Sequence, residues 1–184
     1  MSLSAKKVAI IFEVGTKEEK ISTLESLANA SDPEIINKII SKLDDSDIEV
    51  RGEAFSSLVL NENNISKFLI QNLNSKSKNI RGYSALVLAN RRNTDAILEI
   101  INLTKDQSGM VKACALGALG YLKAKQASKA IHSCFFDSNL EVKKSALKAA
   151  IDIEDKISSD EIKELSKEKD SEIEKLLVQA KINS

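Results

Sequence analysis

Residues 32–51 read DPEIINKIISKLDDSDIEVR, and this stretch decides the fold. Asp32 and Pro33 form an N-cap followed by a first-turn proline, which is typical of a helix start. Apolar residues then recur at helical spacing, as in a helix with one buried face; they are Ile36, Ile39, Ile40 and Leu43. Residues 44–47 are polar and interrupt this helix, and Val50 lies inside the next one. The stretch therefore predicts two helices joined by a short polar turn.

The pair Val50-Arg51 recurs along the chain at nearly constant intervals. Its copies are separated by 30, 31, 31 and 31 residues; they are Ile80-Arg81, Val111-Lys112, Val142-Lys143 and Ile173-Glu174. A fixed period of this length indicates one helical unit copied end to end, in which each copy buries its apolar face on its neighbours. The sequence thus predicts an all-α solenoid of about five to six two-helix repeats, each of about 31 residues.

The same spacing places the boundaries of a single repeat domain over residues 1–184. Capping helices are expected at about 5–14 and 171–182, where the ends of the stack need a polar outer face. The repeats are expected at about 16–43, 46–73, 77–103, 108–135 and 138–168. Two helices per repeat and the two caps amount to about twelve helices.

Serine or threonine followed three residues later by glutamate predicts several of the helix starts. This capping-box spacing occurs at Thr16 with Glu19, Ser46 with Glu49, Ser138 with Glu141, and Ser171 with Glu174. In a capping box, the hydroxyl and the carboxylate each accept a hydrogen bond from a main-chain N–H that the helix leaves free.

Alignment of the copies on their Val/Ile anchors gives three columns that we expect to be buried. Four residues after the anchor the side chain is always small, as required where two helices approach closely: Ala54, Ser84, Ala115 and Ala146. The next column is Phe55, Ala85, Leu116 and Leu147, and the third is Leu58, Leu88, Leu119 and Ala150. These columns predict the core layers of the stack.

Residues 32–51 and residues 111–122, VKACALGALGYL, resemble the HEAT-like repeats first described in phycobilisome (bilin) lyases. The resemblance covers nearly the whole chain and implies a right-handed α-α superhelix. The family includes bilin lyases, deoxyhypusine hydroxylases, DNA glycosylases and interaction scaffolds without catalytic activity. The resemblance therefore specifies a fold and leaves the activity open.

Composition argues against several classes of partner. The chain has 27 basic and 27 acidic residues, so no overall field attracts nucleic acid or an anionic membrane. Its apolar runs are far shorter than the ~20 residues of a membrane span. We expect a cytoplasmic protein, because Cys114 and Cys134 lie within apolar helical patterns as free cysteines do. We expect no signal peptide, because the apolar run after Lys6 and Lys7 leads into charged residues without a small-residue cleavage site. A homo-oligomer is not indicated.

The sequence offers no set of residues for catalysis, for a cofactor or for a metal. The hydroxylase branch of the family binds iron through several histidine-glutamate pairs, whereas His132 is the one histidine here, at the edge of an apolar stripe. A half-buried structural histidine is the better interpretation. Cys134 lies two residues from His132, and partners on a helix are three or four apart. Gly117 and Gly120 lie within a helix, so they do not form a phosphate loop.

The basic residues allow two interpretations. Arg91, Arg92, Lys123 and Lys125 form either a basic edge at adjacent turns or an ordinary solvated rim. The anchor cations Arg51, Arg81, Lys112 and Lys143 recur once per repeat, and we expect them to form a ladder of ion pairs with residues such as Asp47 and Asp137. Exposed pairs of this kind contribute only about 0 to 1 kcal/mol each, so the ladder sets register.

These observations predict a non-catalytic scaffold, not an enzyme, that binds a protein or peptide along its concave face. The family resemblance implies that second helices line this face, which places the partner-binding residues at Lys38, Lys67, Phe68, Leu98, Glu99 and Lys129. Phe68 and Leu98 are an apolar pair with a polar rim, unless a register shift of one residue returns Phe68 to the core. The alternative is a ligand- or nucleic-acid-processing enzyme of the same fold, bilin lyase-like or DNA glycosylase-like.

Overall fold

The computed structural model describes residues 4–182, which contain twelve α-helices and no strand. The chain forms two compact units, Met1–Arg91 and Arg92–Ser184. The first unit contains α1 (Ala5–Val14), α2 (Lys17–Ser26), α3 (Pro33–Ser41), α4 (Ile48–Leu60), α5 (Ser66–Asn72) and α6 (Lys78–Asn90). The second contains α7 (Ile97–Leu103), α8 (Gly109–Tyr121), α9 (Ser128–Ser133), α10 (Leu140–Asp152), α11 (Ser159–Leu165) and α12 (Ser171–Ile182).

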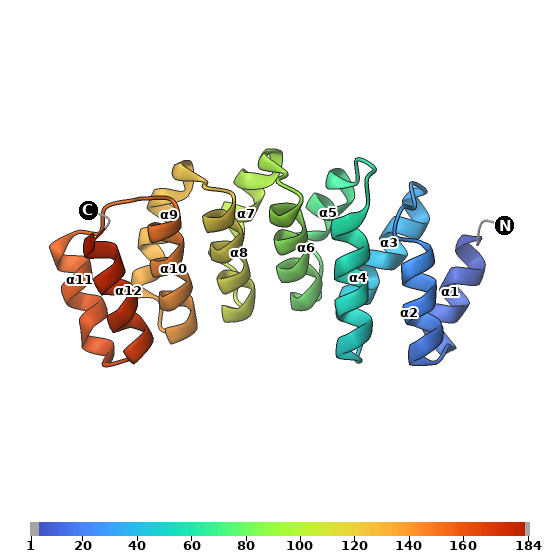
Figure 1. Ribbon diagram of the computed structural model, residues 1–184, viewed down its shortest axis with the longest axis horizontal. Helices are drawn as coiled ribbons and strands as arrows, with labels where there is room; N and C mark the ends of the chain where they lie inside the picture. Colours follow the sequence, from blue (N-terminus) through green and yellow to red (C-terminus); the bar gives the residue numbers. More distant parts are fainter. Residues whose placement is uncertain (1–3, 183–184) are drawn as a thin grey trace. The chain divides into compact units, whose positions relative to one another are not determined.

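Each unit consists of two rows of helices (Figure 1). In the first unit, row A contains α2, α4 and α6, and row B contains α1, α3 and α5. In the second unit, row A contains α8, α10 and α12, and row B contains α7, α9 and α11. Within row A, α4 packs between α2 and α6, and α10 packs between α8 and α12. The expected all-α repeat architecture and the expected number of helices are confirmed.

The core lies between the two rows. The small-residue column is fully buried at Ala54, Ser84, Ala115 and Ala146. The third column is also buried, with Leu58 at 1% exposure and Leu88 at 0%. Phe55 was expected in the core but is half-buried, because its ring reaches past the buried Ala54 to the surface of row A. This one expectation for the columns is wrong.

Side chains cap the first turn of most helices, as the sequence predicts. At some helices, however, the capping residue is not the predicted one. Thr16 and Glu19 form the expected capping box, and Asp32 Oδ1 accepts hydrogen bonds from the main chain of Glu34 and Ile35. The caps expected at Ser46, Ser138 and Ser171 are wrong. The residues that accept hydrogen bonds from the first turns of α4, α10 and α12 are Asp47, Asn139 and Asp170.

The turns before α4 and α10 explain the difference at these two helices. The Oδ1 atoms of Asp45 and Asp137 accept hydrogen bonds from the main-chain N–H groups of Asp47 and Asn139. This local turn moves the helix start beyond the serine, to a residue whose carboxylate or amide oxygen can cap it. An Asx turn therefore competes with the capping box and prevails.

A second regular feature follows the row A helices. Arg92, Lys123 and Glu154 have φ values of 56°, 53° and 59°, the left-handed conformation that ends a helix. The three residues recur at intervals of 31. Glycine adopts this conformation without cost, so a charged side chain here is unfavourable for the local backbone.

Candidate interaction surface

The predicted partner-binding residues of the first unit lie on row B. Lys38 is half-buried on α3, pairs with Glu34 at 3.3 Å, and lines a shallow hollow of about 300 Å³ between α1 and α3. On α5, the Nζ of Lys67 lies 4.8 Å from the centroid of the Phe68 ring. Phe68 is half-buried, whereas its neighbour Leu69 is completely buried. Phe68 therefore lies at the border of the core.

The predicted residues of the second unit are exposed on the short helices α7 and α9. Leu98 is 70% exposed, and Glu99 and Lys129 are also exposed. The hollows described below are lined by other residues. The row B site, with Lys38, Lys67, Phe68, Leu98, Glu99 and Lys129, thus stays a prediction.

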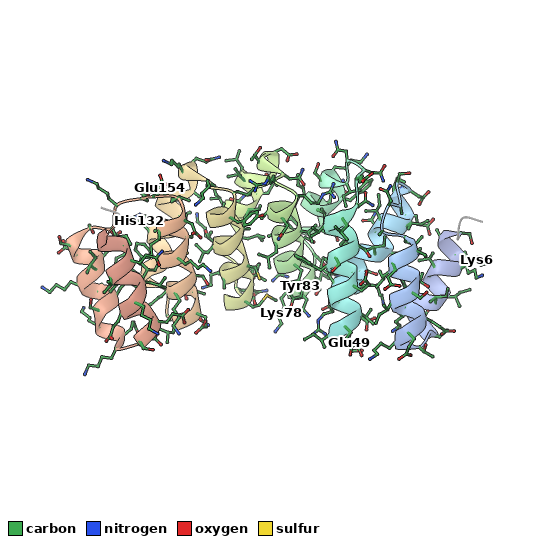
Figure 2. The ribbon with its side chains drawn as sticks, in the orientation of Figure 1. Lys6, Glu49, Lys78, Tyr83, His132 and Glu154 are labelled. Atoms are coloured by element: carbon green, nitrogen blue, oxygen red, sulfur yellow. The ribbon has the colours of Figure 1, made fainter. Side chains whose placement is uncertain are left out.

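Row A of the first unit carries an apolar hollow of about 290 Å³ between α4 and α6. This apolar hollow is lined by Ile48, Arg51, Gly52, Phe55, Tyr83 and Leu86. Ile48 is 73% exposed at its rim, and nothing lies within 4 Å of the place where a Cβ of Gly52 would be. Figure 2 shows Tyr83 on α6. Open space and exposed apolar atoms here form a surface that another molecule can cover.

Arg51 is fixed at the edge of this hollow. Its Nη1 donates to the main-chain oxygens of Asp45 at 2.7 Å and Ser46 at 3.1 Å. The guanidinium therefore fixes the turn before α4, and its methylene groups are left to contact apolar atoms. The sequence signal for this hollow is an aromatic residue beside the buried stripe of a row A helix, at Phe55 and at Tyr83.

Row A of the second unit carries a different hollow, of about 540 Å³, between α8 and α10. The side chains of Arg92, Lys123 and Lys148 line it together with one carboxylate, Asp152, and one aromatic residue, Tyr121. Small residues of α8 and α10 complete its wall: Gly117, Gly120, Ser145 and Ala149. We refer to it as the basic hollow.

The four residues of the expected basic edge have different roles. The guanidinium of Arg91 donates to main-chain oxygens of Leu58 and Asn63, and burial lowers its pKa. Lys125 is exposed and lies 3.9 Å from Glu154. Only Arg92 and Lys123 line the basic hollow. The edge is therefore not one surface.

The expected ladder between repeats forms at its two lysines, whereas Arg51 donates to main-chain oxygens of the turn before its own helix. Lys112 binds Asp137 and Lys143 binds Glu168, each across 25 residues. Lys20 and Asp45 form an equivalent pair at 3.3 Å. Burial on its own would raise the pKa of Asp45, but hydrogen bonds from Lys42, Asp47 and Lys20 lower it. Asp47, expected in the ladder, caps α4 instead.

The groups considered for catalysis have structural surroundings. His132, labelled in Figure 2, is half-buried, as expected. Its Nδ1 lies 2.7 Å from Oε1 of Glu161, and its Nε2 lies 3.2 Å from Oδ2 of Asp155. Burial raises the pKa of Cys114 to about 11 and also raises that of Cys134, so both thiols are weak nucleophiles at neutral pH. Within residues 4–182, no group of three or more His, Cys, Asp or Glu side chains is arranged to hold a metal ion.

Comparisons with known proteins agree with this architecture. A family model described as "HEAT repeat associated with sister chromatid cohesion" matches residues 10–52 and 124–150. A designed armadillo repeat protein in complex with the peptide (KR)4 superposes with a TM-score of 0.56 at 16% identity, covering 98% of this chain and 99% of that one. This chain has an α-solenoid fold, similar to that of designed armadillo repeat proteins.

Other α-solenoid matches are engineered proteins as well. One superposes with a TM-score of 0.59 at 15% identity, covering 99% of this chain and 98% of the other. Another has a TM-score of 0.55 at 20% identity and covers 99% and 96%. No curated protein matches the chain. The part of the α-solenoid that the structure describes contains no helix that is long and apolar enough to cross a membrane. The likeness to phycobilisome lyases in particular stays a prediction.

Proposed function

We propose that this α-solenoid is a non-catalytic interaction scaffold that binds a peptide segment of a partner protein on row A, with the apolar hollow as the anchoring site. The observation that carries the proposal is the exposed apolar lining between α4 and α6, where Ile48 stands at 73% exposure beside the half-buried Phe55 and Tyr83. Aromatic side chains around a hollow are typical of the few residues that supply most of the binding energy at interfaces.

The size of the apolar hollow favours a peptide side chain as its occupant. Pockets for small molecules usually enclose about 300 to 1,000 Å³ and bury most of the ligand. The apolar hollow, at about 290 Å³, is at the lower end of this range and lies open on one face of row A. It therefore suits one or two apolar side chains of a segment that continues along the surface.

The comparisons supply a second argument. One matching structure is a designed armadillo protein in complex with a peptide, and another is described as designed for modular peptide recognition. Repeats of this architecture can therefore present an extended peptide-binding surface. For the non-catalytic part, support comes from His132, which is held by Glu161 and Asp155 and lines neither the apolar nor the basic hollow.

The test compares variants of the apolar hollow on row A with a variant of the predicted row B site. Peptides are selected from a random library on the full chain, and their affinities are measured by fluorescence anisotropy with Ile48→Glu, Tyr83→Ser and Leu98→Ser. Leu98→Ser is a matched control, because Leu98 is as exposed as Ile48 but lies on row B. Circular dichroism and thermal melting check that each variant is folded.

We expect Ile48→Glu and Tyr83→Ser each to weaken binding at least about tenfold, as truncation of an interface anchor does. Leu98→Ser should leave the affinity unchanged. The opposite pattern would move the site to row B, to the predicted residues around Phe68 and Leu98. Failure to select any peptide would contradict the scaffold proposal.

A further inference from the structure

The basic hollow differs from the apolar hollow in charge. It has three cationic side chains, Arg92, Lys123 and Lys148, against the single carboxylate of Asp152. The chain as a whole is neutral, with 27 residues of each sign. The basic hollow therefore carries a local excess of positive charge on a chain that is neutral overall.

Two of these cations also lack acidic partners. Several other lysines of the second unit are paired: Lys112 with Asp137, Lys143 with Glu168, and Lys144 with Asp170 and Glu172. Within residues 4–182, neither Arg92 nor Lys148 takes part in an ion pair. Lys123 donates to the main-chain oxygen of Asp152, which leaves its positive charge without a carboxylate. These charges can therefore bind carboxylates from outside.

Backbone conformation strengthens this argument. Arg92 and Lys123 are two of the three residues in the left-handed conformation after row A helices, where glycine would be more favourable. A side chain kept in such a conformation often serves a function. The side chains of Arg92 and Lys123, each placed just after a row A helix, both line the basic hollow.

The wall of the hollow admits a chain. Nothing lies within 4 Å of the position of a Cβ on Gly117, so α8 presents an open groove there. Tyr121 is 50% exposed, and the guanidinium of Arg92 lies 5.7 Å from the centroid of its ring. An extended peptide in this hollow would therefore meet the aromatic ring of Tyr121 and the cationic side chains that line it.

We propose that the basic hollow between α8 and α10 binds an acidic peptide segment, whose carboxylates pair with Arg92, Lys123 and Lys148. The proposal names the partner chemistry for a scaffold and rests on the proposed function only in taking a peptide as the ligand. Nucleic acid is less favoured, because binding to a duplex rests largely on many phosphate contacts, on the order of six to ten, and three cations supply fewer. Three cations around a hollow of about 540 Å³ match a few carboxylates.

The test uses fluorescein-labelled (Asp-Glu)4 and (Lys-Arg)4 octapeptides and an octathymidine, with the full chain and fluorescence anisotropy at low and moderate salt. The variants are Arg92→Glu, Lys148→Glu and the double variant. Lys163→Glu is the matched control, because it makes the same change of net charge at an exposed position on α11 of row B, outside the predicted row B site. Melting curves confirm that all are folded.

We expect the acidic peptide to bind at least about tenfold more tightly than the basic one, and to weaken as salt rises. Arg92→Glu and Lys148→Glu should each weaken it about three- to tenfold and the double variant more, while Lys163→Glu changes it less than about twofold. Equal losses with Lys163→Glu, no binding of the acidic peptide, or tighter binding of octathymidine with the same sensitivity would overturn the proposal. Because (Asp-Glu)4 has no apolar side chain, these results do not depend on the apolar hollow.

Discussion

The Nη2 of Arg91 donates to the main-chain oxygen of Asn63 at 2.7 Å, which ties the end of α6 to the turn after α4. Its Nη1 donates to the oxygens of Leu58 at 3.1 Å and of Asn61. Carbonyls in the last turn of a helix lack partners within that helix. One guanidinium thus satisfies several of them at once.

Arg91→Lys should therefore destabilise the chain by about 2 kcal/mol, because an ammonium group cannot reproduce the planar array of donors. Urea unfolding followed by circular dichroism measures the loss. Arg92→Lys, at an exposed position next to it, should change stability by less than about 0.5 kcal/mol. Similar values for the two variants would contradict the role assigned to Arg91.

Leu88 is completely buried in α6, within the third core column. Leu88→Ala should cost about 2 to 5 kcal/mol, through lost burial and the cavity that remains. Leu86→Ala, half-buried on the same helix, should cost about 1 kcal/mol or less. Denaturant unfolding of both variants checks the order, and a loss well under 1 kcal/mol for Leu88→Ala would show that the columns are out of register.

Two glycines of α8 should respond in opposite directions to alanine. A Cβ on Gly120 would lie 2.9 Å from Oδ2 of Asp152 and 3.1 Å from Cα of Ala149, so Gly120→Ala should push α8 and α10 apart and destabilise the chain by about 1 to 3 kcal/mol. A Cβ on Gly117 meets nothing within 4 Å. Gly117→Ala should stabilise the chain by about 0.5 to 1 kcal/mol, because alanine favours the helix. Thermal melting distinguishes the two results, and a gain at both positions would refute the close contact at Gly120.

The contacts of His132 predict a dependence of stability on acid pH. Burial on its own would raise the pKa of Asp155 and Glu161. Hydrogen bonds from Ser128 to Asp155 and from His132 to Glu161, together with the charge of His132, lower both below their ordinary values of 3.8 and 4.5. A carboxyl whose pKa is lower in the folded state stabilises that state when ionised. This contribution is complete above the ordinary values and is lost as the pH falls through the lowered ones.

Glu161→Gln should therefore be less stable than the natural chain at pH 7, and the difference should shrink as the pH falls below about 4.5. Unfolding free energies measured between pH 7 and pH 3 test this. Glu174→Gln, at an exposed position on α12, serves as the control and should give a small difference at every pH. A difference for Glu161→Gln that stays constant with pH would show that ionisation of Glu161 does not stabilise the fold.

The repeat pattern predicted most of the fold, because the same positions of each repeat are buried against the neighbouring repeats. Val50 and its copies Val111 and Val142 are buried, and Leu88 lies where the period places it. The caps were predicted less well. Asp45 and Asp137 form turns that compete with a capping box at the next serine. Which of the two forms depends on the local backbone geometry, and the spacing of residues in the sequence does not reveal it.

The surface could be predicted least. The core columns assigned Phe55 to the interior by its position, but the amount of a large ring that stays exposed depends on the neighbouring helix. The pair Arg91-Arg92 shows the same limit. The two adjacent side chains differ because the helix end directs one to the carbonyls after α4 and the other to the basic hollow.

The ion pairs between repeats have a consequence for how such a chain changes its length. In both the Lys112–Asp137 pair and the Lys143–Glu168 pair, the two residues are 25 positions apart in the sequence. The two lysines are themselves one repeat of 31 residues apart. If residues 112–142 were deleted, Val111 would be joined to Lys143, which would keep Glu168 as its partner. Duplicated or lost cassettes of 31 residues therefore reconnect the ladder by themselves. Insertion of one or two residues between a lysine and its carboxylate would instead change the 25-residue spacing of that pair, whereas gain or loss of a whole cassette keeps this spacing.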